Sequence, residues 1–476
     1  MRAINKVLIA NRGEIAVRII RTLKMLGMQT VAIYSAEDAY CLHRFFADEA
    51  VFLGKGELAQ TYLDAAKIVA IAKKVGADAI HPGLGFLAEN AFFAEQTTIS
   101  GLKFIGPSAQ VIATMGDKIK AHKVAEEANI PVLSGCREPL ASLEELEFWA
   151  QKIGYPIILK AARGGGGKGQ RVVYEKKDLA EAFSSCKREA LAYFASDDVF
   201  CEKFLEKPKH IEIQVLFDEH GHGIHLGERD CSIQRKQQKL FEESPSPFLN
   251  EAQREHIGAL AVRLAAHAGY QGLGTVEFII EDPSQPYFME MNTRLQVEHP
   301  VTEMVTGLDL VREQIKVASG LPLDMRAPKL NGWSMEARIN SEDPRFDFRP
   351  TSGRVAKLAW PGGPFVRVDS HLYQGYAIPS SFDSLLAKLI VWAPSREDCL
   401  ARLSSALEEM RIKGVWTNQS FHRALLMHEG FRQGHFSTAF LREEQSYFEK
   451  VADEPSAGHV NRDLAAISAA SRQLGV

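Results

Sequence analysis

Residues 160–169 read KAARGGGGKG, and this short stretch is the most informative one for the fold of the chain. Four consecutive glycines let backbone N–H groups approach an anion closely, while Lys160 and Lys168 supply positive charge on either side. The pattern indicates a phosphate-binding loop at the end of a strand over residues 156–160, although a flexible surface hairpin would also be glycine-rich. No Gly-Lys-Ser/Thr follows at the spacing of a P-loop, so the nucleotide fold must be a different one.

The chain before this loop alternates strands and helices. Residues 7–10 predict a buried strand, residues 14–26 predict a helix with one apolar stripe, and residues 30–34 predict a second strand. The alternation continues through 65–75 and 79–81, which is typical of a doubly wound, Rossmann-like α/β domain. We expect no dinucleotide there, because the first turn reads Asn11-Arg12-Gly13-Glu14 instead of the three-glycine fingerprint.

Two further regions follow. Short strands over residues 172–174, 199–202 and 211–217 surround a helix over 178–195, which predicts a small α+β lid spanning about residues 131–205. A strand-rich portion starts at residue 333 and ends in a helix over 396–410. We expect domains over residues 1–116, 117–332 and 333–446, with residues 447–476 as a loosely held extension.

Composition limits the class of protein. A chain of 476 residues predicts two or three domains, and 46% hydrophobic with 24% charged residues is ordinary for a globular enzyme. The formal net charge of −4 gives no general basic surface for nucleic acid or for an anionic membrane. The six cysteines have no CxxC spacing, and the apolar run over 7–10 is too short for a signal peptide. We therefore expect a cytoplasmic protein.

Residues 290–298 place polar side chains at steps of two: Glu290, Asn292, Arg294, Gln296 and Glu298. In an extended chain these share one face, with neighbours roughly 6 to 7 Å apart at about 3.3 Å rise per residue. Such a face could hold metal at one end and substrate at the other. A solvated helix is an open alternative, because Glu290, Arg294 and Glu298 also lie at four-residue steps.

Glu277 lies on a strand predicted over residues 274–280. Mg²⁺ prefers a few carboxylate or amide oxygens together with phosphates and water, so Glu277, Glu290 and Asn292 make a suitable set of ligands. Taken alone, Glu277 would be better explained as an exposed strand residue. Cys231 also lies among charged residues, but a packed thiol is favoured over a nucleophile there.

Together these motifs resemble the biotin carboxylases of the ATP-grasp superfamily. The resemblance covers about residues 6–441 and rests on the glycine loop, Glu277-Phe278 and these segments: ANRGEIA (10–16), HPGLGFLAEN (81–90), MGDK (115–118), ERDCS (228–232), EMNTRLQVEHPVTE (290–303) and EARIN (336–340). It implies a stand-alone biotin carboxylase subunit with an α/β and α+β multi-domain fold. The Rossmann-like N-terminal domain, an ATP-grasp domain with a glycine-rich lid and a strand-rich C-terminal domain would occupy the three ranges given above.

The resemblance also implies what each matching residue binds. The nucleotide contacts would be Lys118, Lys160, Gly166, Gly167, Glu202, Lys203, Leu205, His210, Gln234 and Gln237, with Glu277 and Glu290 facing the phosphates. The ligands of one or two Mg²⁺ or Mn²⁺ ions would be Glu277, Glu290 and Asn292. The bicarbonate pocket would comprise Lys239, Arg294, Gln296 and Val297. Glu298 would be the general base, and Arg338 would face the ureido oxygen of biotin.

The implied reaction is the ATP- and bicarbonate-dependent carboxylation of carrier-linked biotin through carboxyphosphate. We expect a biotin carboxyl carrier protein and a carboxyltransferase in trans, because the chain has no Met-Lys-Met-type attachment site. An acyl-CoA acceptor is expected, as in the acetyl-CoA carboxylase of fatty acid biosynthesis. A homodimer is also expected, without nucleic-acid or membrane partners.

Three positions depart from the family pattern: Gln237 replaces a common histidine, Gln170 a common methionine and Leu84 a common tyrosine. Glutamine can hydrogen-bond a phosphate but cannot become cationic, so altered nucleotide affinity is expected before loss of activity. Two other classes stay open at this point. One is an ATP-grasp ligase for a different carboxylate, against which the Gln296–Pro300 segment and Arg338 argue, and the other is a non-catalytic regulatory homologue.

Overall fold

The computed structural model describes residues 4–163 and 168–453, and it begins with a five-stranded parallel sheet. The strand order is β3-β2-β1-β4-β5, which confirms the predicted doubly wound arrangement. The strands are β1 (Lys6–Ile9), β2 (Gln29–Ser35), β3 (Glu49–Gly54), β4 (Ala79–His81) and β5 (Lys103–Phe104). The helices are α1 (Gly13–Met25), α2 (Leu42–Phe46), α3 (Ala65–Lys74), α4 (Ala91–Ile99) and α5 (Ala109–Met115), with a 3-10 turn at Leu58–Gln60.

The first turn of this domain is filled by its own side chains. Arg12 donates two hydrogen bonds to the carboxylate of Asp38, at 2.8 and 2.7 Å, and both side chains are buried. Asn11 donates to the carbonyl oxygens of Pro82 and Leu84 at 2.9 and 2.6 Å. The carboxyl edge of the sheet, where a dinucleotide binds in Rossmann folds, is therefore occupied by a buried ion pair and an amide.

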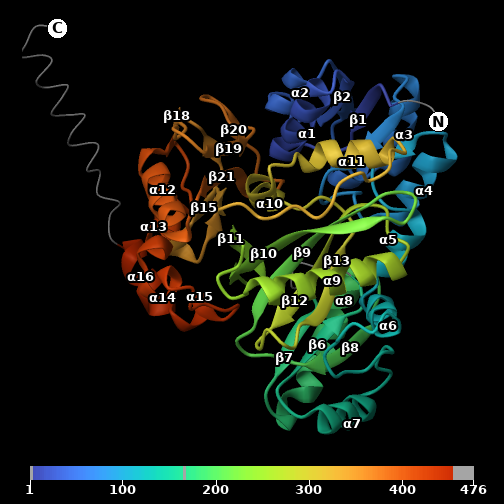
Figure 1. The fold of residues 1–476 in the computed structure, drawn as a ribbon, viewed down its shortest axis with the longest axis vertical. Coiled ribbons are helices and arrows are strands. Elements are labelled where there is room, and N and C mark those ends of the chain that lie inside the picture. Colours follow the sequence, from blue (N-terminus) through green and yellow to red (C-terminus); the bar gives the residue numbers. More distant parts are fainter. Residues whose placement is uncertain (1–3, 164–167, 454–476) are drawn as a thin grey trace, which may run out of the picture.

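A separate three-stranded sheet of order β7-β6-β8 lies at the other end of the molecule from the N-terminal domain (Figure 1). Its elements are α7 (Leu143–Ile153), β6 (Ile157–Ala161), β7 (Gln170–Val173), a 3-10 turn (Lys176–Asp178), α8 (Leu179–Phe194) and β8 (Val199–Lys203). The preceding helix α6 (Lys118–Glu127) packs mainly into the core of the larger sheet. The expectation that residues 211–217 join these short strands is wrong. They lie in the larger sheet, because their side chains are buried on both faces.

The larger sheet has eight strands in the order β13-β12-β9-β10-β11-β14-β21-β19. Its first part comprises β9 (Lys209–Phe217), β10 (Gly223–Arg235), β11 (Gln238–Ser244), β12 (Gly272–Ile280) and β13 (Tyr287–Asn292). The helices α9 (Glu251–His267), α10 (His299–Thr306) and α11 (Leu310–Ala318) accompany it. Strand β11 pairs directly with β14 from residue Phe241 to Ser244, so the sheet crosses the expected boundary at 332/333 without interruption.

The C-terminal part extends this sheet and covers it with helices (Figure 1). Its strands are β14 (Trp333–Asn340), β15 (Glu342–Asp343), β16 (Arg349–Pro350), β17 (Gly353–Arg354), β18 (Lys357–Ala359), β19 (Val366–Ser370), β20 (Ala377–Ile378), β21 (Leu385–Ala393) and β22 (Arg411–Lys413). Its helices are α12 (Arg396–Glu409), α13 (Gln419–Met427), α14 (Glu429–Arg432), α15 (Phe440–Glu443) and α16 (Gln445–Asp453), with a 3-10 turn at Pro344–Phe346. Most of the expected extension, residues 454–476, lies outside the described residues.

Apolar packing joins the parts of the chain. Ile15 and Ile19 of α1 belong to the same buried cluster as Leu273 of β12 and Leu310 of α11. The N-terminal domain therefore shares a core with the large sheet, which fixes α1 against it. Across the described residues, no helix is long and apolar enough to span a membrane.

Candidate active site

Three carboxylates meet on the large sheet because of its register. Glu277 of β12 is the cross-strand partner of both Glu212 on β9 and Glu290 on β13. Directly opposed like charges destabilise a sheet, so this row requires compensating cations. Arg229 of β10 is the cross-strand partner of Glu212 and bonds its carboxylate at 3.0 Å, with both side chains fully buried.

Lys239 supplies the second cation and is the centre of the cluster. Its ammonium contacts Glu212, lies 3.0 Å from Glu277 and lies 2.8 Å from Glu298. Burial disfavours the charged lysine, but the three carboxylates raise its pKa well above the ordinary value. Burial together with the nearby Glu298 and Glu277 raises the pKa of Glu212 to about 7, although Lys239 opposes the shift.

Glu298 is held by two cations from different strands. Lys239 of β11 approaches one carboxylate oxygen at 2.8 Å, and Arg338 of β14 donates to the other at 2.8 Å. Burial would raise the pKa of Glu298, but Lys239, Arg338 and Arg229 hold it well below its usual range. The carboxylate is therefore ionised throughout the neutral range.

The structure corrects the expected extended face over residues 290–298. Strand β13 ends at Asn292, and the chain then turns until α10 begins at His299. Neither a continuous strand nor a helix therefore spans the segment, and Leu295, Gln296 and Glu298 within the turn are all buried. The turn directs Gln296 back to the sheet, where it donates to Glu277 at 2.9 Å and accepts from Arg229 at 2.5 Å.

Arg294 points to the N-terminal domain from this turn. Its guanidinium donates to Glu89 at 2.8 Å and to the side-chain oxygen of Asn292 at 3.0 Å. Glu89 belongs to the HPGLGFLAEN segment, so the contact joins two family motifs that are far apart in sequence. Arg294 is thereby held next to the carboxylate cluster.

The three predicted metal ligands lie together and suit Mg²⁺ or Mn²⁺. Glu277 and Glu290 are cross-strand partners, and the side-chain nitrogen of Asn292 lies 2.7 Å from Glu277. Two carboxylates and an amide oxygen on neighbouring strands are the donors that these cations take alongside phosphate and water. Lys118 lies 2.6 Å from Glu290, at the edge of the same group. The predicted exposed position for Glu277 alone is wrong, since its side chain is buried.

The predicted nucleotide contacts form a second group around the lid sheet. Lys160 of β6 pairs with Glu202 of β8, and both side chains are buried. The ammonium of Lys203 donates to the carbonyl oxygens of Gly154 and Tyr155 at 3.1 and 3.0 Å. The backbone N–H of Lys203 donates to the carbonyl oxygen of Ser134 at 2.8 Å, so both its ammonium and its N–H are engaged within the protein.

His210 connects the nucleotide group to the metal group. Its Nε2 lies 2.8 Å from Glu277, and its Nδ1 lies 2.6 Å from the side-chain nitrogen of Gln234. Burial disfavours the charged imidazole, but Glu277 and Glu212 raise the pKa of His210 above its ordinary value.

The remaining predicted contacts are less constrained. Gln237 is exposed in the turn between β10 and β11, where Lys236 and Gln237 both have positive φ, at 49° and 63°. Gln170 lies opposite Lys160 in the β6–β7 register. Gly166 and Gly167 lie outside the described residues.

Family models match almost the whole described chain. The biotin carboxylase N-terminal domain matches residues 3–112, the ATP-binding domain of carbamoyl-phosphate synthase L chain matches 117–326, and the biotin carboxylase C-terminal domain matches 336–443. Biotin carboxylase 1 of Bacillus subtilis is 50% identical over 441 residues, covering 92% of this chain and 98% of that relative. The chain belongs to the biotin carboxylase family. The predicted family, fold class and enzyme class, an ATP-dependent ligase, are thereby confirmed.

Relatives of biotin carboxylase type also occur in other carboxylases. A pyruvate carboxylase subunit from Methanothermobacter thermautotrophicus is 47% identical, covering 92% of this chain and 90% of that relative. The biotin carboxylase domain dimer of Hydrogenobacter thermophilus 2-oxoglutarate carboxylase, solved with MgADP, ADP and bicarbonate, has a TM-score of 0.92 at 46% identity. That comparison covers 94% of this chain and 99% of the solved chain. Membership of the family therefore does not by itself name the final acceptor.

Sequence reasoning missed Glu212, Arg229 and Glu242 in this biotin carboxylase site. Glu212 contacts Lys239, and Glu242 accepts from Arg338 at 2.5 Å. One signal was available for Glu212: His210, Glu212 and Gln214 alternate with apolar residues along β9, which indicates a polar face. Burial raises the pKa of the Cys231 thiol well above normal, which supports the packed thiol over a nucleophile.

Replacing Lys239 by methionine should destabilise the protein in a pH-dependent way. Without the ammonium, repulsion raises the folded pKa of Glu212, Glu277 and Glu298 above the unfolded value of about 4.3. Carboxyl groups with a raised folded pKa make the free energy of unfolding fall as the pH rises. We therefore expect Lys239→Met to lower it by about 3 to 5 kcal/mol at neutral pH and by less at pH 5.

Denaturant unfolding of wild type and Lys239→Met at pH 5 and pH 8 measures this effect. In the same background, Glu212→Gln should recover part of the lost free energy, because it removes one of the crowded charges. An equal cost at both pH values would contradict the electrostatic explanation.

Proposed function

We propose that this chain carboxylates biotin on a carrier protein with ATP and bicarbonate, the first half-reaction of a biotin-dependent carboxylase. The observation that carries the proposal is the buried, ionised Glu298 held between Lys239 and Arg338, next to a metal-type donor set. The family uses ATP, Mg²⁺ and biotin. The 2-oxoglutarate carboxylase neighbour was solved with MgADP and bicarbonate, which supports the same ligands here.

We assign the bicarbonate pocket to Lys239, Arg294, Gln296 and Val297. Two cations and an amide around one turn are suited to a small anion, and Arg294 offers the planar fork that matches a carboxylate. Glu298 takes the proton of bicarbonate while a bicarbonate oxygen attacks the γ-phosphate of ATP, giving carboxyphosphate and ADP. Positioned proton transfer typically contributes about 10² to 10⁴ in rate.

Arg338 is assigned to biotin. Carboxyphosphate breaks into CO₂ and phosphate, the phosphate accepts the N1 proton of biotin, and N1 then attacks CO₂ to form the N–C bond. Arg338 lies beside Glu298 at 2.8 Å and stabilises the negative charge that develops on the ureido oxygen. The formation of carboxyphosphate and the carboxylation of biotin thus use neighbouring charged groups, Glu298 and Arg338.

The nucleotide is assigned to the lid and the sheet edge. Lys118, Lys160, His210 and Gln234 surround the phosphates, while Glu202 to Leu205 follow the adenine. Glu277, Glu290 and Asn292 would hold Mg²⁺ or Mn²⁺, which when bound neutralises charge on the β- and γ-phosphates. We also propose domain boundaries at 116/117 and 332/333, which the family matches ending at residue 112, spanning 117–326 and starting at 336 support.

Glu298→Gln should keep ATP binding and lose most biotin-dependent turnover. The amide preserves the shape of the carboxylate but removes the base, so kcat should fall about 10²-fold or more. Bicarbonate-dependent ADP release with free biotin gives kcat, and nucleotide titration gives the affinity.

Glu181→Gln is a matched control, because Glu181 is exposed on α8, away from the carboxylate cluster of the large sheet. Turnover of Glu298→Gln near that of the control would rule out the proton transfer assigned to Glu298.

We further propose that the carrier and the carboxyltransferase are separate chains, that the final acceptor is an acyl-CoA such as acetyl-CoA, and that the reaction serves fatty acid synthesis in the cytoplasm. Support for separate chains comes from the length of similar proteins, since this chain covers 98% and 99% of two curated biotin carboxylases. Several similar proteins are free-standing biotin carboxylases, among them those of Bacillus subtilis and Haemophilus influenzae.

A biotinylated carrier should be a better substrate than free biotin. Docking of the carrier raises the effective concentration of biotin, whereas free biotin loses more translational freedom on binding. Phosphate release with either substrate, at matched biotin concentration, measures the difference. A biotinylated lysine in the purified chain, or unaided carboxylation of acyl-CoA, would contradict the separate-chain arrangement.

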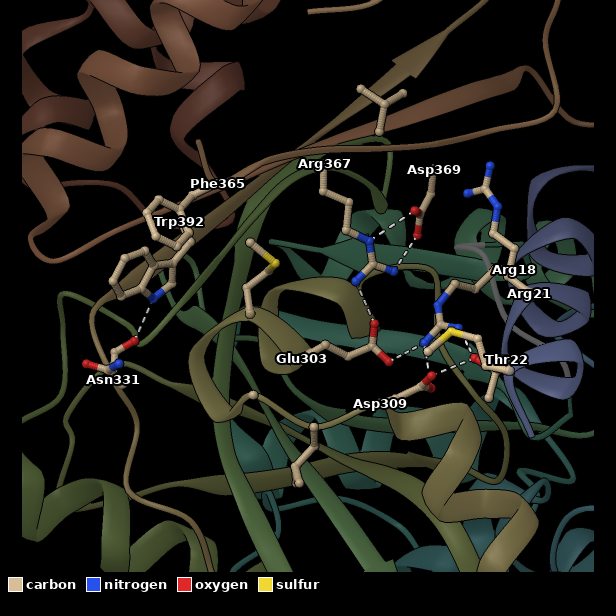
Figure 2. Close-up of a pocket in the computed structure, with 15 residues that line it drawn as sticks. Arg18, Arg21, Thr22, Glu303, Asp309, Asn331, Phe365, Arg367, Asp369 and Trp392 are labelled. Atoms are coloured by element: carbon tan, nitrogen blue, oxygen red, sulfur yellow. Dashed lines mark hydrogen bonds and ion pairs between the residues drawn. The ribbon is translucent and has the colours of Figure 1, made fainter. Parts of the chain in front are cut away.

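We propose a homodimer that forms around a surface hollow between the N-terminal and C-terminal domains (Figure 2). The hollow has a volume of about 680 Å³, and its lining contains none of the assigned site residues. Arg18, Glu303, Arg367 and Asp369 form a connected ion-pair network along it. Each charged group of the network is paired with at least one other.

Exposed apolar side chains border this network. Met25 is 81% exposed and Phe365 is 55% exposed, and both line the hollow. A patch with apolar groups around mixed charges can be complementary to a second copy of itself, which a two-fold symmetric interface requires. The neighbouring 2-oxoglutarate carboxylase domain was solved as a dimer, which supports this assembly.

Phe365→Glu should shift the chain from dimer to monomer, because it replaces an exposed apolar side chain of the proposed contact by a charge that association would bury. Sedimentation at micromolar concentration measures the mass. Phe346→Glu is the control, since Phe346 is 57% exposed but lies outside the hollow. A monomeric wild type, or equal loss of the dimer in both variants, would contradict the proposed interface.

A further inference from the structure

Lys388 is a fully buried lysine for which neither the sequence motifs nor the proposed reaction gives a purpose. It lies on β21 and is the cross-strand partner of Arg338 on β14. Cross-strand partners project from the same face of a sheet, so the two cations lie side by side. Lys388 is therefore directly adjacent to the arginine that holds Glu298.

The ammonium of Lys388 joins three parts of the chain. It donates to the carbonyl oxygen of Val297 at 3.0 Å and lies 3.1 Å from the carboxylate of Glu14 on α1. The carboxylate of Asp369 is more distant, at 4.0 Å. A buried ammonium is tolerated only when it is paired and hydrogen-bonded. Here Glu14 of the N-terminal domain is the paired charge, and Val297 of the 293–298 turn accepts the hydrogen bond.

Two neighbouring strands therefore hold the same turn at successive residues. Arg338 holds the side chain of Glu298, and Lys388 holds the backbone just before it, at Val297. Since the turn lies between the end of β13 at Asn292 and the start of α10 at His299, its backbone position depends on such contacts. Burial raises the pKa of Glu14 and Lys388 opposes that rise, which agrees with a close charge pair.

We propose that Lys388, oriented by Glu14, is a positioning residue for bicarbonate that fixes the Val297–Glu298 turn without touching the substrate. The inference rests on the proposed function, because it concerns the pocket assigned there to bicarbonate. It also assigns the N-terminal domain a part in that pocket, since Glu14 belongs to α1. ATP binding, by contrast, involves the lid and the metal group and should be indifferent to Lys388.

Lys388→Met tests the assignment through the separate KM values for bicarbonate and ATP. Without the charged hydrogen bond to Val297 the turn is less well fixed, so the KM for bicarbonate should rise roughly tenfold or more. The KM for ATP should change less than about twofold if binding there is unaffected. The assay is ADP release with Mg²⁺, free biotin and varied bicarbonate.

A second variant separates positioning from folding. Lys388→Met leaves Glu14 buried without its cation, which destabilises the protein, whereas Glu14→Gln/Lys388→Met removes that unpaired charge. Thermal unfolding of the double variant should return towards wild type, while its KM for bicarbonate stays high. Arg396→Met is the matched control, because it removes another largely buried cation of the C-terminal domain, paired with Glu243 at 2.8 Å and remote from the Val297 turn.

The outcomes are distinguishable. A wild type without bicarbonate-dependent ATP turnover overturns the proposed function. An active wild type whose Lys388→Met variant shows equal changes in both KM values, or whose bicarbonate KM recovers together with stability in the double variant, overturns only the positioning inference. If neither the single nor the double Lys388 variant folds, the role of Lys388 is purely structural, and the positioning inference is overturned as well. A bicarbonate-specific defect that persists in the stable double variant supports it.

Discussion

The contact of Lys239 with Glu212, Glu277 and Glu298 is the interaction on which the site depends. Three buried carboxylates within reach of one another would repel strongly at low local dielectric, and one ammonium at their centre turns that repulsion into attraction. Lys239 helps to keep Glu298 ionised and limits the rise that burial and the neighbouring carboxylates impose on the pKa of Glu212, which is about 7. One cation therefore stabilises the fold and sets the protonation of the candidate base.

The continuous eight-stranded sheet explains how distant functions share one surface. Candidate metal ligands lie on β12 and β13, the central lysine lies on β11, and the arginine assigned to biotin lies on β14. Because backbone hydrogen bonds fix the register between these strands, the distances between the groups are set by the sheet and not by flexible loops. The lid is the exception, since it has its own sheet and its own core.

Buried charge also connects the N-terminal domain to the site. Arg294 contacts Glu89, and Lys388 contacts Glu14, so the turn carrying the candidate base is bound to that domain on two sides. Each of these charged groups meets its partner only in the assembled molecule. Such pairs add little net stability, but losing one partner is costly, which makes the relative placement of the domains specific.

The sequence alone determined the class of protein and supplied most of the residues proposed for its site. The glycine loop, the doubly wound N-terminal pattern and the ordered motifs depend on local chemistry, which is legible in the order of residues. The tertiary structure decided which charges meet. Strand register and helix packing bring together residues that are far apart in the sequence, among them Glu212, Arg229, Lys388 and Glu14. No local pattern encodes that register. For the same reason Glu277 by itself looked exposed, and the polar face over 290–298 became a buried turn.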